Sequence, residues 1–341
     1  MKVALAYDRW ASYEPDASLP DDFGAEFDDE ATITGLLRAI DAAGHEAARL
    51  PVDEELPQRL RRLHLDLVFN IAEGTRGPSR ESLVPAWLDH LGIPYTGSDG
   101  LTLGCSLDKA LTKTLVEAAG VRTLPYKRVG SVEQARQADL NFPVFVKPNR
   151  EGSSMGVRRT SLVRDAEALG KRTAWVLNEY NQDCLIEEYA PGREFCVGLL
   201  GNAPPEILPV VEILNEEDFY SYELKSRHQK RLVCPADICD ELRHEMQDMA
   251  LSAYRTLRCR DLARVDFKLD GNGRPVFLEI NPLPGLSSDY SIYPHQAEKA
   301  GHDYDGLIAA IIDGALKRAH ITERTQPCNT RTTGAGNCET V

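Results

Sequence analysis

The sequence is short of basic residues and has no long hydrophobic run. Among its 341 residues, Lys and Arg number 39 and Asp and Glu number 53, so the formal net charge is −14. Nucleic acids and anionic membranes attract clustered Lys and Arg, and neither is expected as a partner. No apolar run approaches the roughly 18–20 residues that a membrane helix needs, and the N-terminus lacks the pattern of a signal peptide. The composition favours a cytoplasmic protein.

Three patterns that identify common sites are also missing. The eight cysteines include no two CxxC pairs, which argues against a structural zinc site and favours reduced thiols. Neither the Walker A pattern G-x-x-x-x-G-K-[S/T] nor the Rossmann pattern G-x-G-x-x-G is present. A nucleotide site in this chain must therefore be built in another way.

Strand and helix signals alternate in the first hundred residues. Residues 2–7 and 65–72 are apolar runs of strand length, and helical spacing around Ile40 ends at Gly44. The alternation predicts an α/β fold whose first domain has a parallel sheet. Antiparallel strands are expected in the second half. The expected domains are 1–100, 101–190 and 191–320, followed by a disordered tail over 321–341.

A long acidic segment separates the first strand from the first helix. From Asp8 to Glu30, both included, there are nine acidic residues and one basic residue, together with Pro15, Pro20 and Gly24. One interpretation is a solvated loop. The other is a lid that would meet a cationic group of a substrate.

A lysine followed by a Gly/Ser-rich loop is the first candidate site. Lys147 ends an apolar strand, and residues 152–156 read Gly-Ser-Ser-Met-Gly. Glycines let backbone N–H groups approach phosphate oxygens, serines add donors, and the lysine supplies a positive charge. The pattern is compatible with a phosphate-binding loop or with a flexible turn.

The second candidate site is a hairpin predicted by Asp-Gly-Asn-Gly between two alternating runs. With Gly271 and Asn272 as a two-residue turn, Asp266 lies opposite Phe277 and Arg264 lies opposite Glu279. That register puts Val276 and Leu278 on an apolar face, and Phe277 on the face of Asp266 and Glu279. These two carboxylates are then diagonal neighbours about 7–8 Å apart. Together with the amide of Asn281 they suit Mg²⁺; the alternative is a charged solvent face.

A third, weaker signal is the Pro-Gly turn at residues 191–192, which Glu187 and Glu194 flank. A linker of this kind can hydrogen-bond adenine through its backbone and ribose through a carboxylate.

Seven motifs, in order, resemble the ATP-grasp superfamily and, within it, the D-alanine–D-alanine ligases. The resemblance runs over about residues 90–315. It implies an ATP-dependent, ADP-forming ligase with three α/β domains, ATP lying between the central and C-terminal ones. The motifs are GIPYTGSD, LDKALTK, VKPNREGSSMGV, LIEEYAPGREF, FYSYELK, ARVDFKLD and LEINPLPGLSS.

The resemblance also implies roles for individual residues. Phosphate contacts are implied for Lys109, Lys147 and Lys225, and the loop over the phosphates for Gly152, Ser153 and Ser154. Adenine and ribose contacts are implied for Glu187, Ala190, Glu194 and Phe219, and Leu278 belongs to the nucleotide site. Two Mg²⁺ ions, or Mn²⁺, would be bound by Asp266, Glu279 and Asn281. The catalytic groups would be Arg264 and the Gly285 N–H, which would stabilise an oxyanion, and Ser153.

The implied reaction has two steps. A carboxylate attacks the γ-phosphate of ATP to give an acyl phosphate, and an amine then displaces phosphate. A homodimer is expected by family analogy alone.

The departures from the family pattern concern the amino-acid substrates. The family's N-terminal glutamate, which binds the first ammonium, has no counterpart here; Glu26, Asp28 and Asp29 are the candidates. The family tyrosine after the loop lysine is Ser226, and the Pro-Gly turn is followed by Ser-Ser-Asp-Tyr at 287–290. A D-alanine–D-alanine ligase, a ligase for other carboxylates, a nucleotide-binding protein without catalysis and a kinase-like transferase therefore all remain open.

Overall fold

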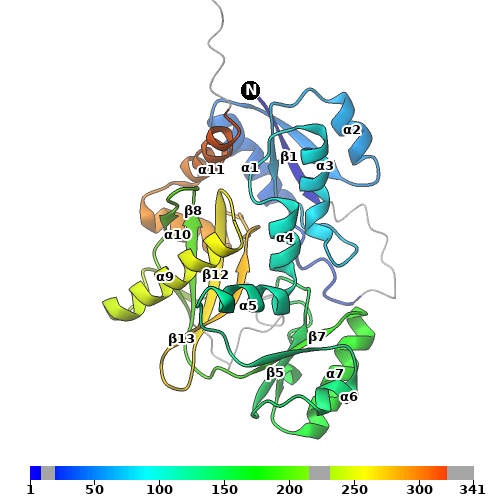
Figure 1. Cartoon of the computed structure of the whole chain (residues 1–341). Helices are drawn as coiled ribbons and strands as arrows, with labels where there is room; N and C mark the ends of the chain where they lie inside the picture. The colour runs from blue at the N-terminus through cyan, green and yellow to red at the C-terminus, as the bar shows by residue number, and fades with distance from the viewer. Residues whose placement is uncertain (9–19, 215–230, 321–341) are drawn as a thin grey trace, which may run out of the picture.

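The computed structural model describes residues 1–8, 20–214 and 231–320. Its elements form three β-sheets with covering helices, which follow one another down the molecule in Figure 1. No helix in the described ranges is long and apolar enough to cross a membrane. The expected tail over 321–341 and the first part of the acidic segment lie outside the described residues.

The first sheet is parallel and has the strand order β2-β1-β3. Alternate residues of β1 face opposite sides: Leu5 packs with α1 and α11, and Ala6 packs with α2 and α3. Because side chains alternate along a strand, a continuous apolar run is explained by helices on both faces. The elements are β1 (Lys2–Asp8), α1 (Glu30–Ala42), β2 (Glu46–Val52), α2 (Leu56–Arg62), β3 (Leu67–Asn70), a 3₁₀ turn η2 (Arg80–Ser82) and α3 (Leu83–Leu91).

Local signals set several of the helix ends. The carboxylate of Asp29 accepts a hydrogen bond from Thr32 N at 2.7 Å and so caps the start of α1. Gly92, with a φ of 66°, ends α3, because glycine enters the left-handed region without a steric cost. The ends of these two helices are therefore set by capping residues that lie beside them in the sequence.

The second sheet is small and antiparallel, with the order β4-β7-β5-β6. Val144 and Val146 of β5 pack against α7 on one face, and Lys147 lies one residue before the end of the same strand. Two helices, α4 and α5, precede this sheet in the chain, yet Val116 of α5 packs in the core of the third sheet. The elements are α4 (Gly100–Leu107), α5 (Lys109–Ala118), β4 (Tyr126–Val129), α6 (Val132–Arg136), β5 (Val144–Pro148), η3 (Arg159–Ser161), β6 (Leu162–Val163), α7 (Ala166–Tyr180) and β7 (Cys184–Glu188).

The third sheet is also antiparallel and has the order β11-β10-β8-β12-β13, with β9 paired to β8. Its core face packs against α9 through Phe195, Val265 and Phe267, all fully buried. Its last helices, α10 and α11, return to the first sheet and join that sheet's core. The elements are β8 (Glu194–Leu200), β9 (Glu206–Ile207), β10 (Val211–Leu214), β11 (Arg231–Val233), α9 (Asp240–Thr256), β12 (Leu262–Leu269), β13 (Pro275–Asn281), α10 (Ile292–Ala300) and α11 (Tyr304–Arg318).

Candidate active site

One cavity of about 310 Å³ brings the predicted site residues together. That volume is within the range of pockets that bind small molecules. Phe219, Lys225 and Ser226 lie outside the described residues. The other residues predicted for the nucleotide, the metal and catalysis all line the cavity: Lys109, Lys147, Gly152, Ser153, Ser154, Glu187, Ala190, Glu194, Arg264, Asp266, Leu278, Glu279, Asn281 and Gly285. Of the three candidates for the substrate ammonium, Glu26 and Asp28 line the cavity and Asp29 does not; Asp29 caps α1 instead.

The hairpin β12–β13 has a different register from the predicted one. Asp266 pairs directly with Glu279, and Arg264 pairs with Asn281. Two single-residue shifts produce this register. The turn holds three residues rather than two, since Asp270 N donates to Arg274 O at 2.9 Å, and a bulge follows the pair Phe267–Phe277. The two shifts add to two residues, so the carboxylates remain on one face and lie closer together than diagonal neighbours.

Between the turn and the bulge, the side chains of β13 point to the faces opposite to those predicted, so the prediction was wrong for this stretch. Phe277 is fully buried in the core beside Phe267, with ring centroids 6.4 Å apart. Leu278 instead lines the cavity, and Val276 packs with it. The three-residue turn reverses the two faces over this stretch, and the bulge restores them at Glu279. Leu278 therefore supplies an apolar wall next to the carboxylates.

Both candidate metal-binding carboxylates are held by cations. Arg264 donates to both oxygens of Asp266, from Nε at 2.7 Å and from Nη2 at 2.8 Å. Lys109 Nζ lies 3.1 Å from Glu279 Oε2. Burial opposes ionisation of Glu279, but Lys109 and then Lys147 outweigh it and lower its pKa to about 2. The site thus presents at least one carboxylate that is charged throughout the physiological pH range.

The donor set fits a magnesium ion. Each carboxylate offers about four lone-pair positions. Asp266 accepts twice from Arg264 and once from Asn281 Nδ2 at 3.1 Å, and the Cys196 thiol also hydrogen-bonds to it. Asn281 donates to Asp266 through its side-chain nitrogen, and no described residue donates to its side-chain oxygen, which is left for a ligand. Mg²⁺ takes few protein oxygens and completes its shell with water and phosphate. The described residues contain no cluster of three or more His, Cys, Asp or Glu side chains arranged for a metal, so the protein ligands here would be two carboxylates and one amide.

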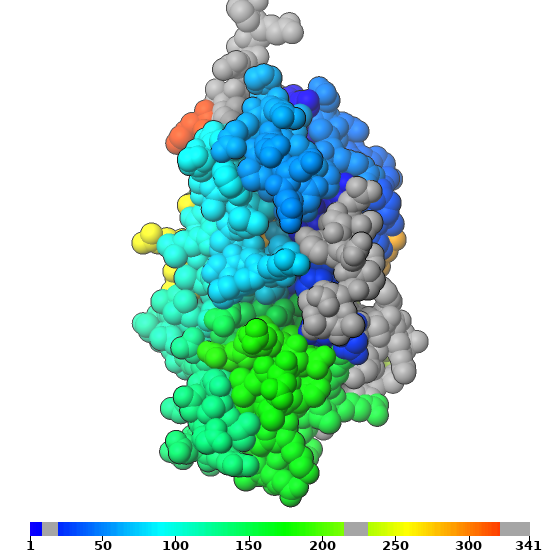
Figure 2. Space-filling view, turned by 90° about the vertical axis from the view of Figure 1, so that its right-hand side faces the viewer, coloured from blue at the N-terminus to red at the C-terminus, as the bar shows by residue number. Residues whose placement is uncertain are grey.

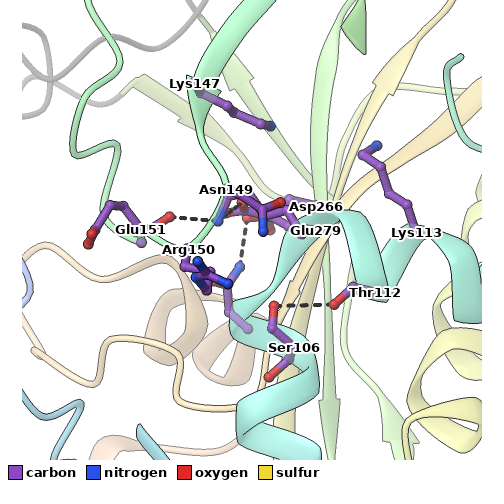
Figure 3. A network of polar contacts seen from close by, with 12 residues as sticks. Ser106, Thr112, Lys113, Lys147, Asn149, Arg150, Glu151, Asp266 and Glu279 are labelled. Atoms are coloured by element: carbon purple, nitrogen blue, oxygen red, sulfur yellow. Dashed lines mark hydrogen bonds and ion pairs between the residues drawn. The ribbon is translucent and has the colours of Figure 1, made fainter. Parts of the chain in front are cut away.

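A buried triad of charges connects the second and third sheets. Glu187 Oε1 lies 2.7 Å from Lys147 Nζ, and its Oε2 lies 3.0 Å from Lys113 Nζ. Lys113 also donates to Phe277 O at 3.0 Å, and Figure 3 shows the side chains of Lys113 and Lys147 extending toward one another. Burial opposes ionisation of Glu187, but the two lysines lower its pKa to about 2. The triad therefore holds Lys147 where its strand ends at the cavity.

Asn149 joins the two lysine-bearing elements. It is fully buried directly after β5, and its Oδ1 accepts from Ala110 N at 3.0 Å. Its backbone oxygen accepts from Lys109 N at 3.1 Å. The first turn of α5 is thereby fastened to the end of β5, so Lys109 and Lys147 reach the same cavity.

The Gly/Ser-rich loop is a strained turn. Ser153 and Ser154 both have positive φ, 50° and 61°, which non-glycine residues rarely adopt. Gly156 has a φ of 70°, and a Cβ there would lie 2.5 Å from Pro148 Cγ, so only glycine fits. Strain of this kind persists where neighbouring contacts impose it, and it is common at ligand-binding sites.

The described part of the acidic segment is not simply a solvated loop: Asp21 and Asp29 are exposed, but the side chains of Asp22 and Glu26 are buried. The Asp22 side chain is fully buried, and it accepts from Gly156 N at 2.8 Å, from Arg158 Nη2 at 3.1 Å and from Tyr180 OH at 2.7 Å. Glu26 accepts from Gly152 N at 2.7 Å. Figure 2 shows dark-blue N-terminal atoms against the green second sheet. The segment therefore clamps both ends of the Gly/Ser-rich loop.

We expect Asp22→Asn to loosen this loop. The amide would place an N–H group toward donors that now share a buried carboxylate, which costs about 1–3 kcal/mol of stability. Weaker ATP binding should accompany the loss, measured by urea unfolding and by calorimetry. Asp21→Asn is the matched control, because the neighbouring Asp21 side chain is 78% exposed. Equal stability and ATP affinity in the two variants would contradict a clamping role.

Several residues of the site were missed in the sequence. Lys113 lies four positions after Lys109, on the same face of α5, and that spacing was the available signal. Arg80 and Glu81 are neighbours in η2, whereas Glu151 follows β5, and these two segments meet only in the fold. Arg80 Nη2 lies 2.9 Å from both Glu26 Oε2 and Glu151 Oε2. Arg80 lies in η2 of the first domain, so its two ion pairs connect that domain to the acidic segment and to the Gly/Ser-rich loop.

A comparison with protein families decides the affiliation of the chain. The model described as "D-ala D-ala ligase C-terminus" matches residues 115–313. The chain belongs to the D-alanine–D-alanine ligase family. It is accordingly an ATP-dependent ligase that forms C–N bonds, with the ATP-grasp fold.

Individual relatives agree with this affiliation. The chain is 38% identical over 296 residues to the uncharacterized protein y4sG of Sinorhizobium fredii, covering 83% of this chain and 87% of that one. It is 35% identical over 283 residues to a D-alanine–D-alanine ligase of Aquifex aeolicus, covering 82% and 93%. The structure of a D-alanine–D-alanine ligase from Bacillus anthracis complexed with ATP superposes with a TM-score of 0.73 at 23% identity, covering 94% and 99%. This structural likeness shows the fold.

Proposed function

We propose that the chain activates the carboxylate of one amino acid with ATP and joins it to the amine of a second, so that a peptide bond, ADP and phosphate are formed. One observation carries the proposal. The cavity combines the cations Lys109 and Lys147 with the paired carboxylates Asp266 and Glu279 and with Arg264. A site that only held a nucleotide would have no need of Arg264 beside the carboxylates.

In the first step, a carboxylate oxygen of the substrate attacks the γ-phosphorus of ATP. A new O–P bond forms, the bond to the β-phosphate oxygen breaks, and ADP leaves with the bonding electrons. Lys109 and Lys147 stabilise the charge on the phosphate oxygens because they are already in place. Asp266, Glu279 and Asn281 would hold Mg²⁺, with Mn²⁺ as the alternative, and the bound metal would neutralise further phosphate charge.

In the second step, the amine attacks the acyl carbon, a proton leaves the nitrogen, and phosphate departs. The guanidinium of Arg264, fixed by its two bonds to Asp266, is oriented to donate to the developing oxyanion together with Gly285 N–H. Both groups line the cavity. Acyl phosphates react with water, so the clamped Gly/Ser-rich loop would also serve to exclude solvent.

The remaining assignments belong to the same proposal. Glu187, Ala190, Glu194 and Leu278 would surround the adenosine, and Gly152, Ser153 and Ser154 the phosphates. The domain limits near residues 100 and 190 are proposed with them. Because ATP is consumed, we place the protein in the cytoplasm, and a homodimer is proposed by family analogy; light scattering of the purified chain tests it.

The test is ADP release with Mg-ATP against a panel of amino acids, alone and in pairs. D-alanine comes first, since it stands in the names of the curated relatives. Amine-dependent ADP release, with a dipeptide identified by mass, is the expected result. ATP binding without ADP release on any pair would overturn the ligase reaction and leave a nucleotide-binding protein.

A further inference from the structure

The cavity extends past the ATP-binding side toward the first sheet. There it is lined by Glu26, Asp28, Glu73 and Glu81, which we call the acidic recess. Glu73 follows β3, and the backbone N–H of Glu73 donates to Asp8 at the end of β1 at 2.7 Å. The recess thus lies outside the carboxyl ends of two parallel strands, where open α/β sheets generally bind ligands.

The cations near the acidic recess are already engaged. Arg80 Nη2 is shared between Glu26 and Glu151, and its Nη1 donates to Arg150 O at 2.8 Å. Lys109 is paired with Glu279 on the other side of the cavity. Arg80 therefore pairs directly with Glu26 and Glu151, and Arg80 acts on Glu73 and Glu81 through longer-range charge.

Glu81 and Glu73 feel the charge of Arg80, but no described residue contacts either carboxylate directly. Glu81 is only 9% exposed and lines the cavity, yet neither its carboxylate nor that of Glu73 has a hydrogen bond or ion pair with any residue in the described ranges. Leaving a buried carboxylate without a partner is costly, because the charged form loses its hydration. A ligand that supplies N–H donors and positive charge would satisfy both groups.

The protonation of the recess agrees with this requirement. Burial, and then the charge of Glu26, raise the pKa of Glu81 to about 8. Burial, followed by the charges of Glu26 and Glu81, also raises the pKa of Glu73. Near neutral pH the empty recess therefore takes up protons. A cation that enters it would restore the charged carboxylates and release those protons.

The chemistry of the acidic recess favours an organic cation over a metal ion. No three of the acidic side chains in the described ranges are arranged as a metal cluster. An ammonium or guanidinium group does not need such convergence, because its donors satisfy carboxylates one at a time. A single α-ammonium would compensate only one of the two unpartnered carboxylates, whereas a substrate with two cationic groups would compensate both.

We propose that the acidic recess binds the side-chain cation of the carboxylate substrate, so that the enzyme selects a basic amino acid, such as lysine, ornithine or arginine, over alanine. The inference rests on the proposed ligase function and adds a substrate class to it. Glu81 and Glu73 are the specificity-determining residues.

Substrate preference is the first test. ADP release is measured with lysine, ornithine, arginine, alanine and norleucine, each as both stereoisomers, where norleucine keeps the carbon chain of lysine without its ammonium. The wild type should prefer lysine to norleucine. Glu81→Gln should reduce this preference by about 10- to 100-fold, as expected for one charge-assisted hydrogen bond, without changing the ATP dissociation constant. Glu133→Gln, at an exposed position in α6, is the control and should leave the preference unchanged.

A binding measurement separates this inference from the ligase reaction. Lysine is titrated calorimetrically into the protein saturated with Mg²⁺ and a non-hydrolysable ATP analogue, in two buffers of different ionisation enthalpy. We expect binding of a basic amino acid with proton release near pH 7, weakened in Glu81→Gln and Glu73→Gln. Lysine binding without any ADP release would overturn the proposed ligase function but support binding of a basic amino acid in the acidic recess. If no basic amino acid binds, or if neutral substrates are turned over as well as basic ones, the proposal that the acidic recess selects a basic amino acid is overturned.

Discussion

Asp266→Asn is expected to reduce kcat by about 100-fold or more, the size of effect seen when a charge-stabilising group is removed from an active site. The substitution keeps the shape of the side chain but removes the negative charge that faces Glu279 across the hairpin. Arg264 loses its bidentate partner, so the guanidinium that would meet the oxyanion is no longer held. Metal binding and oxyanion stabilisation are thus weakened by one change.

Steady-state kinetics with a magnesium titration, together with thermal unfolding, would test this prediction. A protein that is folded at the assay temperature but turns over slowly at every magnesium concentration is the expected outcome. Asp270→Asn is the control, because Asp270 lies in the turn of the same hairpin and accepts from Asn272 N and Arg274 N. Activity of Asp266→Asn within a few-fold of the wild type would show that the metal assignment is wrong.

Glu187→Gln is the second substitution with a large expected effect. The change leaves Lys113 and Lys147 buried without the carboxylate that both now contact. Removing one member of a buried ion pair typically costs about 3–5 kcal/mol, because the remaining charge has no solvent to replace its partner. We expect a loss of unfolding free energy of about this size, measured in urea, and a weaker affinity for ATP as Lys147 moves.

The lowered pKa of Glu187 predicts how the stability difference between wild type and Glu187→Gln changes with pH. Since the pKa of Glu187 is lowered from 4.5 to about 2 in the folded protein, its contribution is fully present above pH 4.5 and is lost as the pH falls toward 2. The difference between wild type and variant should shrink over that interval. Glu188→Gln is the matched control, because Glu188 follows on the same strand and accepts hydrogen bonds from Asn141 N and Nδ2 rather than from a buried lysine. Similar losses in both variants would contradict the triad.

Much of the local structure was determined by neighbouring residues in the sequence. Asp29 and Asp108 cap the helices that follow them, at 2.7 Å and 3.0 Å, and Gly92 ends α3. These features depend on contacts within a few residues, so a reading of the chain can find them. The order of the seven motifs likewise carried the affiliation that the family comparison confirmed.

The hairpin shows where such reading fails. Both a two-residue and a three-residue turn satisfy Asp-Gly-Asn-Gly, and the bulge near Leu278 leaves no mark in the sequence. Packing decides between the registers, because only the observed one buries Phe277 beside Phe267 while Asp266 faces Glu279.

What the sequence alone determined about this protein is therefore its α/β class, its local helix ends and the kinds of groups that the site contains. The tertiary structure decided which of these groups are paired. Lys113 and Lys147 share Glu187, Asp22 and Glu26 hold the Gly/Ser-rich loop, and Glu81 has no described partner. Charge pairing depends on distance and burial between segments far apart in the chain, and neither is encoded in the order of nearby residues.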